Sequence, residues 1–91
     1  MENEEEKTTR KKEETLKLVF PFDHKGQHLA EVTMRRPKVG DMLVARKGKG
    51  DDAEQELMLF ASLTGVPPEA FQEMDMLDYQ KLQGIYRGFL S

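Results

Sequence analysis

Few side chains in this sequence could do chemistry, and the two histidines are the first candidates. His24 and His28 lie four residues apart, and Asp23 precedes the first of them. A tetrahedral metal site needs a third and a fourth ligand, but the chain contains no cysteine and no further histidine to supply them. We therefore interpret the two histidines as a turn residue and a strand residue, and we expect neither a metal site nor a cofactor.

The carboxylates and serines form no catalytic pattern either. Asp75 and Asp78 could pair for acid–base catalysis, but their spacing at a helix start favours capping and compensation of the helix dipole. Ser62 and Ser91 have no histidine placed in the sequence to act as a base, and thiol catalysis needs a cysteine. The glycines between Lys47 and Gly50 lack the frame of a phosphate-binding loop. The sequence therefore predicts no enzymatic activity.

The balance of charge argues against a nucleic-acid partner. The 91 residues include 17 acidic and 14 basic side chains, which gives a net charge of -3 at pH 7. Proteins that bind a duplex usually carry a basic patch and an excess of basic residues. The basic residues form two short clusters with acids near them: Arg35, Arg36 and Lys38, and then Arg46, Lys47 and Lys49. We interpret both clusters as solvated surface.

Cysteine usage and hydropathy bear on the compartment. A small domain without any cysteine has no disulfide framework, which fits a reducing interior. Charged residues directly after Met1 and the lack of a long apolar run exclude a secretory signal and a membrane span. We therefore expect a cytoplasmic protein without membrane contact.

The first 14 residues differ in composition from the rest of the chain. Residues 2–14 contain ten charged side chains and no large apolar group. Such a segment buries too little apolar surface to offset the entropy of ordering it. We predict a disordered or frayed helical leader over 1–14, with a partner-binding arm as the alternative. A single small α+β domain is predicted over 15–91.

Two alternating segments predict a β-hairpin at the start of that domain. Side chains of a strand alternate between its faces with a period of two. One face of the first arm would carry Leu16, Leu18, Phe20 and Phe22, and one face of the second would carry His28, Ala30, Val32 and Met34. Residues 23–26 between the arms have turn chemistry, because Gly26 accepts a positive φ. The hairpin ends where Pro37 removes a backbone donor.

The remainder of the chain reads as helices. Asp51 or Asp52 and then Asp75 are typical N-caps, and Gly65 is a typical C-terminal stop. The apolar spacing and these signals predict three to four short α-helices, over about 39–46, 52–64, 68–73 and from 76 onward. The predicted fold class is thus α+β, with an N-terminal β-hairpin followed by three to four short helices.

The order of these landmarks carries a resemblance. They are Leu18, Phe20–Pro21, Gly26, the strand end from Glu31 to Arg36, Pro37 to Asp41, Leu63 to Gly65, and Leu77 to Tyr79. From about Leu16 to Tyr86 the chain resembles the small tail assembly chaperones of contractile-tailed phages. One departure is Lys38, where a Thr would be expected to act as N-cap and form a capping box with Asp41.

The resemblance implies a role without catalysis. Members of that family hold the tape measure protein, a very long helical chain, soluble until tail tube subunits polymerise around it. They are thought to act in the host cytoplasm and to be absent from the finished virion. In many tailed phages a longer product of the same gene arises by ribosomal frameshifting. Whether such a product exists here, and whether the chain forms a homo-oligomer, stays open.

An excess of apolar helical residues predicts a surface for the partner. So small a domain has no room inside for all of its methionines and leucines, and methionine adapts well to apolar partner helices. The residues predicted to bind the partner are Met42, Leu43, Met58, Leu59, Leu63, Met74 and Met76. They follow from the apolar excess and not from the resemblance.

Two other functions stay open at the level of sequence. The acidic, solvated surface also permits a minor structural component of the phage tail or baseplate. A small regulatory DNA-binding protein is the other alternative, against which the acidic charge balance argues.

Overall fold

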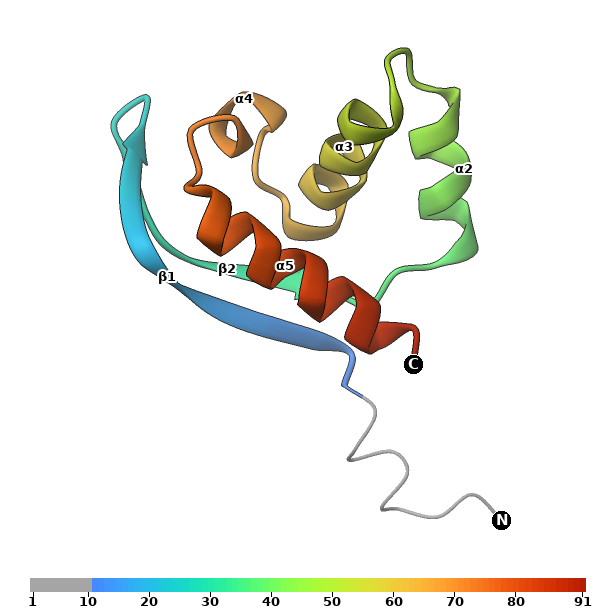
Figure 1. The fold of residues 1–91 in the computed structure, drawn as a ribbon, viewed down its shortest axis with the longest axis horizontal. Helices are drawn as coiled ribbons and strands as arrows, with labels where there is room; N and C mark the ends of the chain where they lie inside the picture. Colours follow the sequence, from blue (N-terminus) through green and yellow to red (C-terminus); the bar gives the residue numbers. More distant parts are fainter. Residues whose placement is uncertain (1–10) are drawn as a thin grey trace.

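A β-hairpin packed against helices forms the structure, which is a computed structural model that describes residues 11–91. The strands are β1 (Glu13–His24) and β2 (Gln27–Arg35). The helices are α2 (Val39–Lys47), α3 (Asp52–Thr64), α4 (Pro68–Phe71) and α5 (Met76–Phe89). Figure 1 shows the curved hairpin along one side of these helices. The predicted α+β class and the order of a hairpin followed by three to four helices are confirmed.

The hairpin begins before the predicted domain boundary at Thr15. Glu13 pairs with Arg35 and Glu14 pairs with Met34, so both glutamates belong to β1. Most of the predicted leader over 1–14 lies outside the described residues, which start at residue 11.

A two-residue turn joins the strands. Lys25 and Gly26 both have positive φ, 49° and 80°. Positive φ at both central residues is the mark of a type I′ turn, whose twist matches that of the flanking strands. The turn predicted over 23–26 is therefore present, and it is confined to its last two residues.

β1 contains an irregularity, so its side chains do not alternate along the whole strand as predicted. The register is regular up to the pair Lys17–Glu31 and resumes at Phe22–Leu29, so the four residues between Lys17 and Phe22 lie opposite Ala30 alone. Extra residues in one strand bend it and redirect its side chains. Leu16 and Leu18 pack inward as predicted, but Phe20 is 52% exposed.

The face predicted to be buried in the second arm is also partly wrong, because of the same irregularity. Val32 and Met34 are buried as expected, whereas His28 and Ala30 are exposed. Leu29 packs against the core in their place. The prediction was wrong there because the change in register breaks the strict period of two.

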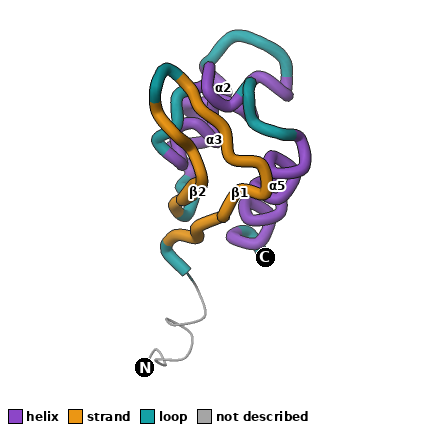
Figure 2. The backbone as a smooth tube through the Cα atoms, turned by 90° about the vertical axis from the view of Figure 1, so that its left-hand side faces the viewer, coloured by secondary structure: helices purple, strands orange, loops and turns teal. Residues whose placement is uncertain are grey.

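The helices lie on one face of the hairpin, and the core sits between the two layers. Figure 2, turned by 90°, shows both strands on one side of the helices. Helix α5 lies against β1, and α3 lies against β2. The largest apolar side chains without any exposed surface are Met34, Phe60 and Leu82, one each from β2, α3 and α5. Helix α2 packs on α3 at the end of the molecule away from the turn.

Helix ends follow the predicted signals. The Asp51 carboxylate accepts a hydrogen bond from the Glu54 amide at 2.9 Å, and the Glu54 carboxylate accepts one from the Asp51 amide at 3.0 Å. This reciprocal pair is a capping box at the start of α3. Gly65 ends α3 with φ of 75°, and Asp75 caps α5 by accepting from the Leu77 amide at 2.9 Å.

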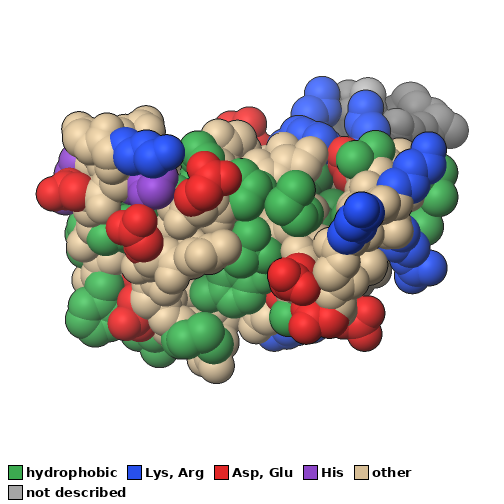
Figure 3. Space-filling view, turned by 90° about the horizontal axis from the view of Figure 1, so that it is seen from above, with side chains coloured by type: hydrophobic (Ala, Val, Ile, Leu, Met, Phe, Trp, Pro, Cys, Tyr) green, Lys and Arg blue, Asp and Glu red, His purple; other side chains and the backbone are tan. Residues whose placement is uncertain are grey.

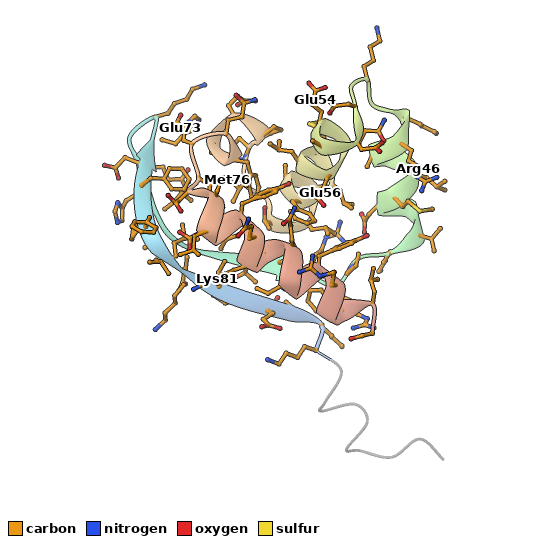
Figure 4. All side chains as sticks on the ribbon, viewed as in Figure 1. Arg46, Glu54, Glu56, Glu73, Met76 and Lys81 are labelled. Atoms are coloured by element: carbon orange, nitrogen blue, oxygen red, sulfur yellow. The ribbon has the colours of Figure 1, made fainter. Side chains whose placement is uncertain are left out.

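Glu56 links α3 to α5 inside the helical layer. Its Oε1 accepts hydrogen bonds from the Tyr79 hydroxyl and from Nε2 of Gln83, both at 2.9 Å. Burial raises the pKa of Tyr79, and the bond to the Glu56 carboxylate raises it further. The Tyr79 ring also stands 5.5 Å from that of Phe60, a spacing at which tilted aromatic pairs attract. Figure 4 shows Glu56 reaching toward α5.

Asp78 lies in the first turn of α5, where it compensates the helix dipole as predicted, and it has a second role that the sequence did not predict. Its side chain has no exposed surface. The two carboxylate oxygens accept hydrogen bonds from the backbone amides of Val19 and Phe20, at 2.9 and 3.0 Å. These amides lie in the irregular part of β1, next to Pro21, which has no amide hydrogen. Asp78 therefore replaces the partners that β2 does not provide.

Replacing Asp78 by Asn is expected to lower the free energy of unfolding by about 2–3 kcal/mol, because the amide group can accept from one side only and leaves a buried donor unpaired. Urea denaturation measures the change. Asp75→Asn is the matched control on the same helix. It should stay within about 0.5 kcal/mol of the original chain, since Asn is an equally good N-cap. Equal stability of the two variants would contradict a special role for Asp78.

Candidate functional site

The connection between β2 and α2 is fixed by an ion pair. Nη1 and Nη2 of Arg35 lie 2.9 and 2.8 Å from the two carboxylate oxygens of Asp41. Such a bidentate pair fixes the relative orientation of the two side chains in addition to joining opposite charges. The Asp41 carboxylate also accepts a hydrogen bond from the Lys38 amide at 2.8 Å. One carboxylate thus holds the first turn of α2 to the end of the hairpin.

The capping box expected at the start of α2 is half formed. Asp41 makes the bond from the third helical position back to the N-cap residue, as a complete box requires. The N-cap residue is Lys38, whose ammonium has no lone pair to accept a bond from the helix. The departure at Lys38 therefore removes a side-chain acceptor only. The Asp41 amide donates instead to the Lys38 carbonyl at 2.9 Å, and the helix begins at Val39.

Helix α2 buries none of its nine residues, although it is rich in apolar ones. Its exposed apolar side chains are Val39, Met42, Leu43 and Val44. A helix of this length gains little from its own hydrogen bonds in water and usually depends on packing. The apolar surface of α2 that does not face α3 is left without a partner within residues 11–91.

An apolar groove of about 420 Å³ runs between α2 and α3. Val44, Ala45 and Gly48 form the wall from α2 and its end. Met58, Leu59, Ala61 and Ser62 form the wall from α3, and the groove continues to Val66 and Pro67. The one charged residue in its lining is Asp41, which is already paired with Arg35. We call this feature the α2–α3 groove.

Four of the seven residues predicted to bind a partner lie on this part of the molecule. Met58 and Leu59 line the α2–α3 groove itself. Met42 lies in a second hollow, where α2 faces Tyr86. Leu43 is exposed on α2.

The other three predicted residues are elsewhere. Leu63 and Met74 are 2% and 7% exposed, so they belong to the core and offer no surface to another chain. Met76 is exposed at the start of α5, apart from the α2–α3 groove (Figure 4). Whether any of the exposed residues contacts a partner stays a prediction.

Sequence reasoning missed Val44, which is exposed and lines the groove. It lies between Leu43 and Ala45 in a run of apolar residues. The run of three consecutive apolar residues from Met42 to Val44 was the available signal, because such a run cannot lie on a single helix face.

The side chains with catalytic potential have separate structural partners. Nδ1 of His24 is 2.8 Å from a carboxylate oxygen of Glu73, and Nδ1 of His28 is 2.7 Å from one of Asp23. The two histidines therefore do not converge on one point. Among residues 11–91, no group of three or more His, Asp or Glu side chains could hold a metal ion.

The two basic clusters have different surroundings. In the first, Arg35 is paired with Asp41, and the guanidinium of Arg36 lies 5.7 Å from the centre of the Phe89 ring. In the second, Arg46, Lys47 and Lys49 are exposed and form no ion pair with another residue in the described range. Figure 3 shows basic side chains at the α2 end of the molecule and apolar ones across the middle of that face.

A family model described as phage tail assembly chaperone proteins, E, or 41 or 14, matches residues 15–91. The chain belongs to this family. No curated protein matches it, and no solved structure does. The resemblance predicted from the order of landmarks is therefore confirmed, and the match extends beyond Tyr86 to the last residue. Membership indicates a role as a tail assembly chaperone and a partner among the tail proteins.

The matched region of this tail assembly chaperone runs from β1 through α5 and so includes both walls of the α2–α3 groove. The structure also explains two of the sequence segments on which the resemblance was based. The Arg-Arg-Pro and Gly-Asp segments join through the Arg35–Asp41 pair, and the Leu-Asp-Tyr segment contains the carboxylate that holds β1. Within the described part of the chain, no helix is both long and apolar enough to cross a membrane.

Arg35→Gln in this chaperone should raise the pKa of Asp41. The hydrogen bonds from Arg35 chiefly hold that pKa at about 2, below the ordinary value of 3.8. A lowered pKa in the folded state adds stability that is present above about pH 4 and is lost as the pH falls through about 2. The variant should lose this contribution, and its Asp41 should titrate closer to 3.8.

Carboxyl NMR titration between about pH 2 and 6 spans the two values and measures the shift directly. Arg36→Gln is the control, because that side chain contacts Phe89 and not Asp41. An Asp41 pKa that is the same in Arg35→Gln as in the original chain would show that the pair is absent in solution.

Lys38→Thr should complete the capping box of α2 and raise the free energy of unfolding by about 0.5 kcal/mol, the low end of N-cap effects, because the Asp41 amide already donates to the carbonyl of residue 38 at 2.9 Å and would share its hydrogen with the hydroxyl. Thermal denaturation and hydrogen exchange of the α2 amides report the gain. Lys38→Ala removes the same ammonium without adding an acceptor. If that variant gains as much as Lys38→Thr, the effect comes from charge and not from capping.

Proposed function

We propose that this tail assembly chaperone binds the tape measure protein and keeps it soluble until the tail tube polymerises around it. Family membership supports a tail protein as the partner. The observation that carries the proposal is the apolar surface of α2 and α3, which no other part of residues 11–91 covers. A soluble chain of this size seldom exposes so many grouped apolar side chains unless they meet another molecule.

The physical requirement of such a partner matches this surface. A very long helical chain with apolar stripes associates with itself through those stripes while it waits for assembly. A small protein that covers a stripe with its own apolar helices blocks that association. Met42 and Met58 suit the task, since methionine adjusts to irregular apolar surfaces.

We also propose that the chaperone acts in the host cytoplasm and is released before the virion is complete. A partner that occupies the stripes of the tape measure protein would compete with the tube subunits for the same surface. Release is therefore a consequence of the proposed role. A longer frameshifted product of the same gene fits the same role, as an additional member of the complex.

Coexpression with the tape measure protein of the same genome tests the role. We expect the soluble fraction of the tape measure protein to rise severalfold over a control in which this gene carries an early stop codon. The reason is that the covered stripes can no longer associate. An equal soluble fraction with and without the chaperone would contradict the proposal.

Mass spectrometry of purified virions tests the release. We expect the chain to be absent or far below the level of the tail tube subunit. A stoichiometric amount would instead identify a minor structural component of the tail or baseplate, which is the alternative function.

A further inference from the structure

We propose that the α2–α3 groove binds a single amphipathic helix of the tail protein, with acidic side chains of that helix beside Lys47 and Lys49. The inference rests on the proposed function and specifies which surface is used and which kind of segment fits. It follows from the shape of the groove, from its lining, and from the charges at its end.

The shape fits a helix. Two helices form the walls, and an amphipathic helix laid into an apolar groove between helices is a recurring mode of recognition. Helix α2 has nine residues and is therefore about 13 Å long. A bound helix would present two to three turns to it, with anchors at the spacing i, i+3 or i+4, and i+7.

The lining selects an apolar face. Val44 is 69% exposed and Met58 is 47% exposed, and they stand on opposite walls of the groove. The Asp41 carboxylate at the groove is occupied by Arg35 and by the Lys38 amide, so it offers little to a ligand. Affinity must then come from burial of apolar side chains.

The first segment of the chain itself cannot be the occupant. Residues 2–14 contain no large apolar side chain, so they have nothing to bury against Val44 and Met58. Their charges would also have to leave water without apolar contacts in return.

A second copy of the chain fits poorly because of charge. Lys38 precedes α2, and Arg46, Lys47 and Lys49 lie at its end. A two-fold axis along α2 would bring the same basic residues together, and an axis across α2 would bring its two basic ends together. Like charges placed opposite one another weaken an interface, whereas acidic residues on a different chain would strengthen it.

Two of the basic residues lie at one end of the groove. Gly48 lines the groove, and its neighbours Lys47 and Lys49 are exposed. Arg46, on the last turn of α2, lines the second hollow with Met42 and not the groove (Figure 4). Neither lysine forms an ion pair with another residue in the range 11–91, so both are available to the acidic flank of a helix in the groove.

Affinity of the full chain for the coexpressed and purified tape measure protein tests the groove. Met58→Glu and Val44→Glu place a charge in the apolar lining and should each weaken binding by about tenfold or more. Both residues are exposed, so the variants should remain folded, which circular dichroism checks. Leu90→Glu makes a similar change at an apolar residue that is 64% exposed and outside the groove. It should bind within about twofold of the original chain.

The charge of the bound segment is tested separately. Reversal of Lys47 and Lys49 to Glu should slow association and flatten its dependence on salt. Carbodiimide joins amines to carboxylates in direct contact, so it should cross-link Lys47 or Lys49 to Asp or Glu of the tape measure protein. The cross-linked segment should be helical, with apolar residues on its other face.

The outcomes separate this inference from the proposed function. If the original chain does not bind the tape measure protein, the proposed function fails. If it binds and the two groove variants bind equally well, or if Leu90→Glu loses as much, the groove assignment is overturned while the function stands. A dimer of the chain alone that dissociates in Met58→Glu would identify a second copy as the occupant. Cross-links to a segment without an acidic flank would overturn the charge assignment.

Discussion

The buried carboxylate of Asp78 holds the hairpin and the helices together. Regular pairing of β1 stops after Lys17, and the amides of Val19 and Phe20 would otherwise lack the partners that a neighbouring strand supplies. Asp78 accepts from both, and it does so from the first turn of α5, where the helix dipole also favours a negative charge. Its position fixes α5 on β1, which in turn brings Leu82 into the core.

Stability and exposed apolar surface are located in different parts of this molecule. The core joins β1, β2, α3, α4 and α5, whereas α2 contributes no buried residue to it. Helix α2 is held by the Arg35–Asp41 pair and by its contact with α3. Its outward side chains therefore do not contribute to packing inside the domain. A group of exposed apolar residues without an internal role is typical of a surface that contacts another chain.

The sequence predicted the elements well because their signals are local. A capping box at Asp51, a left-handed glycine at Gly65 and a period of 3.6 in α5 each depend on neighbouring residues only. The irregularity in β1 could not be predicted in this way, since register depends on the partner strand. Phe20 was therefore wrongly placed inward. The dipole role predicted for Asp78 is consistent with its place in the first turn of α5, but its bond to β1 was missed because the two residues are 58 positions apart.

The candidate site, too, could be predicted from the sequence only in part. An apolar excess in a small domain predicts that some apolar residues must be exposed, but it does not say which. Leu63 and Met58 lie on the same helix, and only the packing of α3 against β2 decides that Leu63 is buried and Met58 is exposed. The groove exists because α2 covers just one side of α3 and the chain then turns away at Pro67. A site made from the space between two helices is thus a property of their arrangement, and the composition of the chain determines only that such a space will be apolar.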